Sequence, residues 1–210
     1  MKKLAVLFVA IFILSLTSCV SSSPEKNLET DIQAEVKVKR EEMRGVWLSF
    51  YEISDMCKGK TEEEFTENVK AVMVNLSNSK FNTVFYQARC FSDALYKSSV
   101  FPTSKYIVDT GGDKIAYDPL EIFIEIASEY NIDVHAWVNP LRISYENNIS
   151  KLCKSNPAKI LYNEDEDLSS LIICEKGLFY NPADEEARKV ILSGVRELLE
   201  NYDIIYLVKL

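Results

Sequence analysis

This chain of 210 residues lacks the short motifs that mark several common enzyme classes. It contains no G-x-G-x-x-G, no phosphate-binding P-loop and no G-x-S-x-G, which argues against dinucleotide-binding, NTP-binding and α/β-hydrolase proteins. It has one histidine, His135, and no Cys-x-x-Cys pair among its five cysteines. We therefore expect neither a metal site nor a bound cofactor.

Basic residues are also few relative to acidic ones, and the formal net charge is -8. A nucleic-acid partner is not expected, because such proteins need a basic surface. Four cysteines are widely spaced in the body of the chain: Cys57, Cys90, Cys153 and Cys174. In an exported protein they could form two disulfides with three possible connectivities, or they could remain free thiols.

The N-terminus has the order of an export signal. Lys2 and Lys3 precede the apolar stretch Leu4–Leu16, which is too short to span a bilayer. The sequence Leu-Thr-Ser-Cys at Leu16–Cys19 resembles a bacterial lipoprotein signal-peptidase site, although an ordinary signal peptide with a chance cysteine is the alternative. We expect residues 1–18 to be a lipoprotein signal peptide and Cys19 to carry lipid, anchoring an exported protein to the bacterial membrane, facing the cell envelope.

Residues 19–42 are rich in Ser, Glu and Lys and contain no aromatic residue, which predicts a flexible tether. From Met43 onward, the length indicates one domain. Apolar periodicity and capping residues predict an alternating order of elements. The expected strands are 44–50, 81–89, 132–139 and 202–210, and the expected helices start at Thr61, Asp118 and Asn181.

Two smaller features lie between these elements. A long loop runs from Cys90 to Tyr117, and a loop of that length in a compact domain is usually functional or disordered. Residues 171–174 and 178–180 are candidates for a small hairpin around Gly177, and residues 148–153 for a helical turn.

Alternation of strands and helices predicts an α/β fold with a parallel sheet. Two architectures share this order of elements, a doubly wound parallel sheet and a (β/α)8 TIM barrel. A complete barrel needs about 250 residues. Residues 43–210 would therefore form a partial barrel with about its first four strands.

The strand at 132–139 carries the clearest candidate site. Its apolar residues alternate with His135, Trp137 and Asn139, whose polar groups need partners if they are buried. Pro140 ends the strand and Arg142 follows in a loop. An indole beside imidazole, carboxamide and guanidinium suits a carbohydrate-binding cleft, whereas the alternative is an ordinary strand whose polar side chains are satisfied in the core. On the strand at 81–89, we expect Thr83, Phe85, Gln87 and Arg89 on one face.

Five segments in this order resemble the glycosyl hydrolase-like 10 family: Glu42–Ser49, Phe81–Arg89, Asp93–Ser98, Tyr117–Leu120 and His135–Pro140. That family comprises exported or lipid-anchored bacterial (β/α)8 proteins, and the resemblance covers about the N-terminal half of its domain. It implies hydrolysis of a glycosidic bond, with peptidoglycan glycan strands as the substrate class. It also implies substrate binding at strand ends by Trp47, Gln87, Arg89, His135, Trp137, Asn139 and the loop residue Arg142.

The chain departs from the family pattern near Asp203, because the paired aspartates that typically follow the fourth strand are absent. Glycoside hydrolysis normally uses two carboxyl groups some ~5 to 10 Å apart. Asp93 is the candidate catalytic carboxyl, and Asp118 is better explained as a helix cap. We expect a truncated domain that does not hydrolyse glycan by itself and that self-associates through open sheet edges. The alternatives are a non-catalytic glycan-binding lipoprotein and a scaffold lipoprotein.

Overall fold

A computed structural model describes residues 42–109, 111–164, 169–204 and 207–209. The predicted signal peptide, Cys19 and almost all of the predicted tether lie outside the described residues. The chain divides into two units, Met1–Glu42 and Met43–Leu210, and every described helix and strand belongs to the second.

The second unit is a mixed α/β fold with a parallel sheet. Its strands are β1 (Gly45–Leu48), β2 (Thr83–Arg89), β3 (Asp133–Val138) and β7 (Leu207–Lys209), and all neighbouring pairs are parallel. The order in the sheet is β1-β2-β3-β7, so spatial order follows chain order without a reversal among the described strands. The predicted α/β class with a parallel sheet is confirmed.

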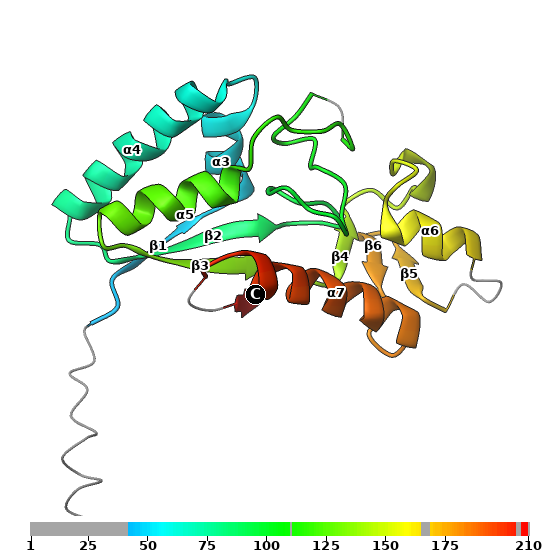
Figure 1. The fold of residues 1–210 in the computed structure, drawn as a ribbon. Coiled ribbons are helices and arrows are strands. Elements are labelled where there is room, and N and C mark those ends of the chain that lie inside the picture. The colour runs from blue at the N-terminus through cyan, green and yellow to red at the C-terminus, as the bar shows by residue number, and fades with distance from the viewer. Residues whose placement is uncertain (1–41, 110, 165–168, 205–206, 210) are drawn as a thin grey trace, which may run out of the picture. The chain divides into compact units, whose positions relative to one another are not determined.

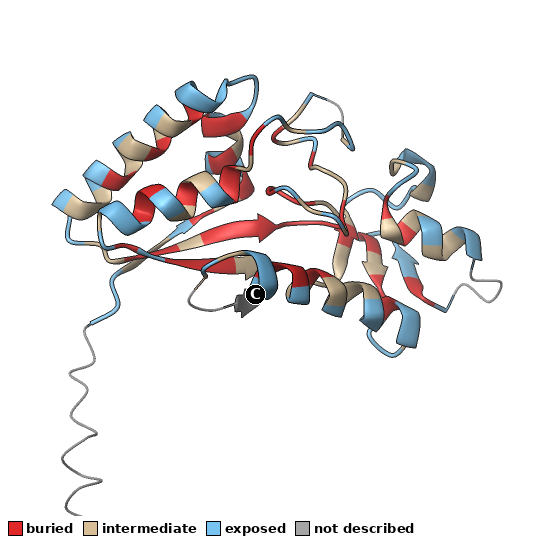
Figure 2. Cartoon of the chain, in the orientation of Figure 1, coloured by how far each residue is buried: buried red, intermediate tan, exposed pale blue. Residues whose placement is uncertain are grey.

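Helices α3 (Phe50–Cys57), α4 (Glu62–Asn78) and α5 (Pro119–Glu129) cover one face of this sheet (Figure 1). The core there is built from alternate strand residues: Val84, Tyr86 and Ala88 of β2, and Val134, Ala136 and Val138 of β3. Helix α7 (Glu185–Asn201) adds Leu198 to the same cluster. Buried residues accordingly concentrate on the strands and on the helix sides that face them (Figure 2).

The predicted helix starts at Thr61 and Asp118 are confirmed. Thr61 accepts a hydrogen bond from the backbone of Glu64 in a capping box, and Asp118 accepts from the backbone of Leu120. The last helix begins later than expected, because Asp184 and not Asn181 is its N-cap.

Helix α3 was not predicted, although its start signal is present in the sequence. Ser49 and Glu52 form a second capping box immediately after β1. The expected strand at 44–50 therefore ends at Leu48, and the chain turns into α3 at Phe50.

A second, antiparallel sheet contains β4 (Arg142–Ser144), β6 (Gly177–Tyr180) and β5 (Leu171–Cys174) in that order. The predicted hairpin is confirmed, as is the predicted turn, seen as the short helix η1 (Ile149–Lys151). The placement of Arg142 in a loop is wrong, because this residue begins β4. Strand β4 depends on pairing with the distant β6, and helix α6 (Pro157–Glu164) was likewise not predicted.

The expectation that Arg89 shares a face with Gln87 is also wrong. In the pairing of β2 with β3, Gln87 lies opposite Trp137 but Arg89 lies opposite Val138, so β2 contains an irregularity between them. A β-bulge of this kind inserts one residue and redirects the side chains that follow. Arg89 therefore points to the face of Val138 and is fully buried.

The cysteines settle one alternative left open by the sequence. Cys57, Cys90, Cys153 and Cys174 are free, the first two of them buried. Among the helices of the described ranges, none is long and apolar enough to cross a membrane.

Candidate functional site

Four aromatic rings gather on the sheet face opposite the helices, and we call them the ring cluster: Trp47, Phe85, His135 and Trp137. Ring centroids of Trp47 and Phe85 are 4.2 Å apart in a stacked arrangement, and Trp137 meets Trp47 edge-on at 5.2 Å. His135 meets Phe85 edge-on at 5.1 Å. Gly45 permits this packing, since a Cβ there would lie 2.6 Å from Phe85 Cε2. Trp47 remains 42% exposed, so part of the cluster is accessible.

Polar groups beside the ring cluster already have internal roles. Trp137 Nε1 donates to Asn139 Oδ1 at 2.9 Å. Gln87 Oε1 accepts from the backbone N–H of Phe50 at 2.9 Å, which fixes the start of α3. Burial lowers the pKa of His135, so its imidazole is neutral at pH 7. The structure thus brings together four of the predicted binding residues on one face, with Gln87 adjoining them.

The two predicted arginines lie elsewhere. Arg142 is half-buried, and its guanidinium lies 4.7 Å from the ring centroid of Tyr145 and 4.6 Å from that of Phe179. It also donates to the carbonyl of Lys176, so it holds the antiparallel sheet together. The Arg89 guanidinium is stacked 3.5 Å from the centroid of Phe101 inside the core.

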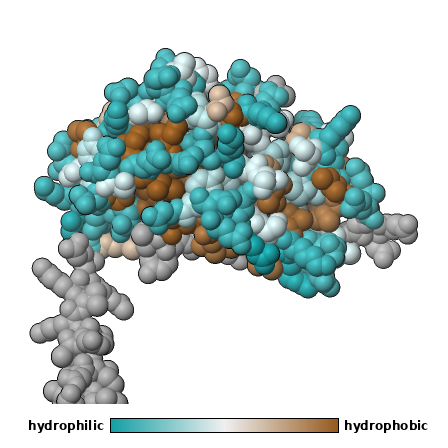
Figure 3. Space-filling model, viewed as in Figure 1, coloured by the Kyte–Doolittle hydropathy of each residue, from teal (hydrophilic) through white to brown (hydrophobic). Residues whose placement is uncertain are grey.

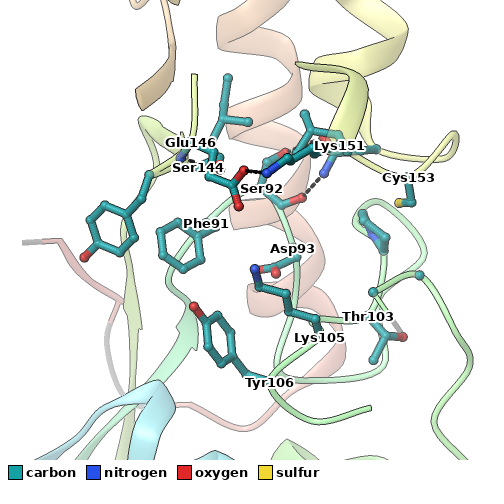
Figure 4. A pocket seen from close by; sticks show the side chains of 17 residues that line it. Phe91, Ser92, Asp93, Thr103, Lys105, Tyr106, Ser144, Glu146, Lys151 and Cys153 are labelled. Atoms are coloured by element: carbon teal, nitrogen blue, oxygen red, sulfur yellow. Dashed lines mark hydrogen bonds and ion pairs between the residues drawn. The ribbon is translucent and has the colours of Figure 1, made fainter. Parts of the chain in front are cut away.

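A cleft of about 560 Å³ opens directly beyond the carboxyl end of β2. One wall comes from the loop between β2 and α5, and the other from the chain that follows β4 (Figure 4). Its chemistry-bearing residues are Phe91, Asp93, Lys105, Tyr106, Tyr145, Glu146 and Lys151. Active sites of parallel α/β folds lie at this edge of the sheet. Among the predicted site residues, Asp93 alone lines the cleft. The sequence pointed to the other lining residues within 90–117 only through the unusual length of that loop.

Asp93 has the surroundings of an acid that can exchange a proton near neutral pH. Its Oδ1 atom is buried and has no hydrogen-bond partner among the described residues. Burial raises the pKa of the Asp93 carboxyl to about 6, while a hydrogen bond with Ser104 and the positive charges of Arg89 and Lys105 act in the opposite direction. A carboxyl group in this range is suited to general acid catalysis.

The second carboxyl in the cleft is in the opposite state. Glu146 is exposed and forms an ion pair with Lys151. The hydrogen bond from Lys151 lowers the pKa of Glu146, so this carboxylate stays ionised. One cleft thus contains a carboxyl whose pKa is raised toward neutrality and one whose pKa is lowered. Separated pKa values of this kind allow two carboxyls to take different roles as acid and base.

Aromatic side chains flank the two carboxyls. Tyr106 lies 4.4 Å from Phe50 and 6.1 Å from Phe91 between ring centroids. Tyr145 lies 5.0 Å from Phe91 and is 62% exposed. Apolar ring faces beside a few polar groups are typical of small-molecule sites, and they match the alternating apolar faces and hydroxyl edges of a sugar.

The remaining residues of the segment Asp93–Ser98 anchor the loop. Tyr96 Oη and Ser98 Oγ donate to Glu197 Oε2 on α7, at 3.0 and 2.5 Å, and the backbone N–H of Ser99 donates to Oε1. The segment therefore directs Asp93 into the cleft while its other polar groups fasten the loop to α7. No group of three or more His, Cys, Asp or Glu side chains among the described residues is placed to hold a metal ion.

Comparisons with known proteins identify relatives of this chain. Residues 42–207 match the sequence model of the family described as glycosyl hydrolase-like 10. Glycosyl hydrolase YngK of Bacillus subtilis (strain 168) is 30% identical over 166 residues, covering 78% of this chain and 31% of YngK. Glycosyl hydrolase DigH of Escherichia coli (strain K12) is 28% identical over 159 residues, covering 68% of this chain and 36% of DigH. The chain thus spans about a third of the length of these curated relatives.

The fold is also similar to part of a solved structure. α-L-Fucosidase isoenzyme 2 from Paenibacillus thiaminolyticus superposes with a TM-score of 0.52 at 15% sequence identity. The match covers 80% of this chain and 23% of that protein. At this identity, the likeness concerns the fold alone.

Proposed function

The chain belongs to the glycosyl hydrolase-like 10 family, and we propose that it binds a glycan in the cleft beside Asp93. The observation that carries the proposal is a carboxyl with a pKa of about 6 in a cleft walled by aromatic rings beyond the end of β2. Peptidoglycan glycan strands are the proposed ligand class, in an exported protein of the cell envelope.

We further propose that the parallel sheet is the first part of a (β/α)8 barrel. The order β1-β2-β3-β7 supports this assignment, since a doubly wound sheet reverses its strand order at a switch point. The ring cluster would then face the barrel interior, and Asp93 would lie at the barrel end where active sites occur. An experimental structure of a longer protein with strands inserted between these four would contradict the assignment.

Within this arrangement, the glycan contacts the cleft and extends toward the exposed edge of the ring cluster. Phe50 links the two regions, because it follows β1 and its ring packs on Tyr106. The proposed substrate-binding residues are Trp47, His135, Trp137 and Asn139. Gln87 fixes the start of α3 beside them, whereas Arg89 and Arg142 lie elsewhere and are not part of the proposed glycan contact.

The chain by itself is proposed to bind glycan without cleaving it. Hydrolysis uses a second carboxyl as a base or nucleophile, and in the described part of the cleft that second carboxyl, Glu146, is engaged in an ion pair with Lys151. Release of reducing ends by the purified chain would overturn this proposal and would assign Glu146 a catalytic role.

The decisive experiment measures retention of the full chain on purified peptidoglycan glycan strands, with the variants Asp93→Asn and Asp109→Asn. Asp109 lies in the same loop but outside the cleft, so its variant is the matched control. We expect Asp93→Asn to weaken retention about tenfold, the usual loss for one hydrogen bond to a charged or strongly polar group. Equal retention of all three proteins, or none by any, would reject the proposed site.

The sequence at Leu16–Cys19 motivates one more proposal, a lipid anchor on Cys19. Fractionation of cells producing Cys19→Ser tests it, and we expect the variant to leave the membrane fraction. An unmodified N-terminus on the mature wild-type protein would overturn it.

A further inference from the structure

We propose that the cleft selects glycans that carry a carboxylate on the sugar, and that Lys105 is the residue that receives this group. The inference rests on the proposed function and adds a ligand class and a specificity-determining residue to it.

Lys105 is the available cation of the cleft. It is exposed, and in Figure 4 no hydrogen bond or ion pair joins its Nζ to another residue drawn in the cleft. The other ammonium group lining the cleft, that of Lys151, is already paired with Glu146. Charge-assisted hydrogen bonds to carboxylates are among the stronger polar contacts in proteins, so an unpaired ammonium in a cleft favours an anionic ligand.

The position of Lys105 places this ammonium among the acids of the site. Its side chain extends toward Asp93 in Figure 4, and its Nζ lies 5.6 Å from the ring centroid of Tyr106. Its charge acts on the carboxyls of both Asp93 and Glu146. Among the described contacts, no ion pair joins the Lys105 ammonium to the carboxyl of Asp93 or of Glu146. The ammonium therefore remains available to a ligand.

Two groups of the cleft are therefore open to a ligand. Asp93 Oδ1 is buried without a described partner, and Lys105 Nζ is exposed without one. A neutral sugar can satisfy Asp93 through a hydroxyl group and leaves the ammonium to solvent. A sugar that offers a hydroxyl and a carboxylate satisfies both.

The distribution of charge also favours a ligand that carries a carboxylate. The chain as a whole has a formal net charge of -8, which repels anions. The cleft opposes its two carboxyls with two lysines. Lys58, which does not line the cleft, donates its Nζ to the backbone carbonyl of Lys105 at 3.3 Å. The lysines of the cleft thus offset its two carboxyls within an acidic chain.

The test compares three tetrasaccharides by calorimetric titration of the full chain: a hyaluronan tetrasaccharide, its carboxyl-reduced form and chitotetraose. The first carries a carboxylate on every second sugar, and the other two are neutral. We expect the wild type to bind hyaluronan at least about tenfold more tightly than the reduced form, with the difference shrinking at high salt. Lys105→Gln should abolish the difference while still binding the reduced form, and Lys97→Gln, an exposed control in the same loop but outside the cleft, should retain it.

The outcomes separate the two proposals. Equal binding of charged and neutral sugars, or a preference that survives Lys105→Gln, overturns this inference and leaves glycan binding standing. Failure of all three sugars and of peptidoglycan strands to bind overturns the proposed function and this inference with it.

Discussion

Asp93 and Glu146 line one cleft, yet their surroundings shift the pKa values of their carboxyls in opposite directions. Burial dominates at Asp93, whereas the neighbouring Lys151 dominates at the exposed Glu146. Residue type alone does not reveal such a difference, since both are acids in loops. The two pKa values differ because folding buries the Asp93 carboxyl away from water and places Lys151 beside the Glu146 carboxyl.

The raised pKa of Asp93 predicts a pH dependence of stability. Between pH ~4, where the unfolded carboxyl titrates, and the folded value of about 6, the folded state holds a proton that the unfolded state has lost. Raising the pH through this window therefore destabilises the protein. Asp93→Asn should be more stable than the wild type by about 3 kcal/mol at pH ~7.5 and nearly equal to it at pH ~4. Urea unfolding across this range checks the prediction, and a difference independent of pH would contradict it.

The ring cluster leads to a prediction about its two tryptophans. Trp47 is in register with Phe85, whereas Trp137 is in register with Gln87, two residues nearer the carboxyl edge of the sheet. We expect Trp137→Ala to weaken retention on peptidoglycan strands more than Trp47→Ala, even though Trp47 is the more exposed side chain. Glycan pull-down of both variants is the measurement, and the reverse order would place the glycan away from this edge.

At the scale of elements, α7 packs closely against the loop after β2 at Gly194. A Cβ on this residue would lie 2.3 Å from Phe101 Cε2 and 2.7 Å from Arg89 Nη1. The same helix side presents Glu197, which accepts from Tyr96 Oη. The loop that carries Asp93 thus depends on a close approach of α7.

Gly194→Ala should therefore destabilise the protein, against the rule that alanine favours helices. Overpacking a buried site costs about 1–3 kcal/mol, and the gain in helix propensity recovers about 1 kcal/mol of it. We expect a net loss of about 1 kcal/mol in the free energy of unfolding, together with weaker glycan retention as the loop shifts. Leu192→Ala on the exposed side of the same helix is the control and should change neither. A variant as stable as the wild type would show that Phe101 can move without cost.

Most of the parallel sheet and its main helices were predictable, because their signals are local. Thr61 and Asp118 cap their helices within three residues of themselves, and the alternation from Asp133 to Val138 reports a strand directly. The antiparallel β4 and the irregularity before Arg89 were not predictable. Both arise from pairing with partners distant in sequence, where register decides which way a side chain points.

The candidate site was predictable only in part, for a related reason. The period-2 pattern placed His135 and Trp137 on one face of their strand and Phe85 on one face of its own, since alternation encodes a shared face. Trp47, in contrast, became a candidate only through the family resemblance. The cleft was recognised only through Asp93 and the length of its loop. Lys105 and Tyr145 come from segments without periodicity, and only the tertiary fold brings them to one cavity. Their roles could be inferred after the two walls were seen together.

At the scale of the whole molecule, the described sheets leave unpaired edges and exposed apolar groups. Strands β1 and β7 each pair on one side among the described residues, as does β5, whose Ile172 and Ile173 are 44% and 48% exposed. Hydrophobic side chains also reach the surface among hydrophilic ones on the face drawn in Figure 3. Open edges of this kind pair with other chains unless something covers them.

Residues 43–210 produced alone should therefore self-associate at micromolar concentration. Because Ile173 lies on an edge strand and outside the core, Ile173→Lys places a charge on that edge with little effect on folding, and it should shift the distribution toward monomer. Sedimentation velocity measures both proteins, and Leu192→Lys on the exposed face of α7, which adds the same charge away from the edge strand, serves as a control for altered net charge. A wild-type segment that stays monomeric and unfolds in one cooperative transition would mean that the sheet edges are protected within the chain itself. An association unaffected by Ile173→Lys would instead assign it to the edges of the parallel sheet or to the exposed part of the ring cluster, where Trp47→Lys becomes the next variant to measure.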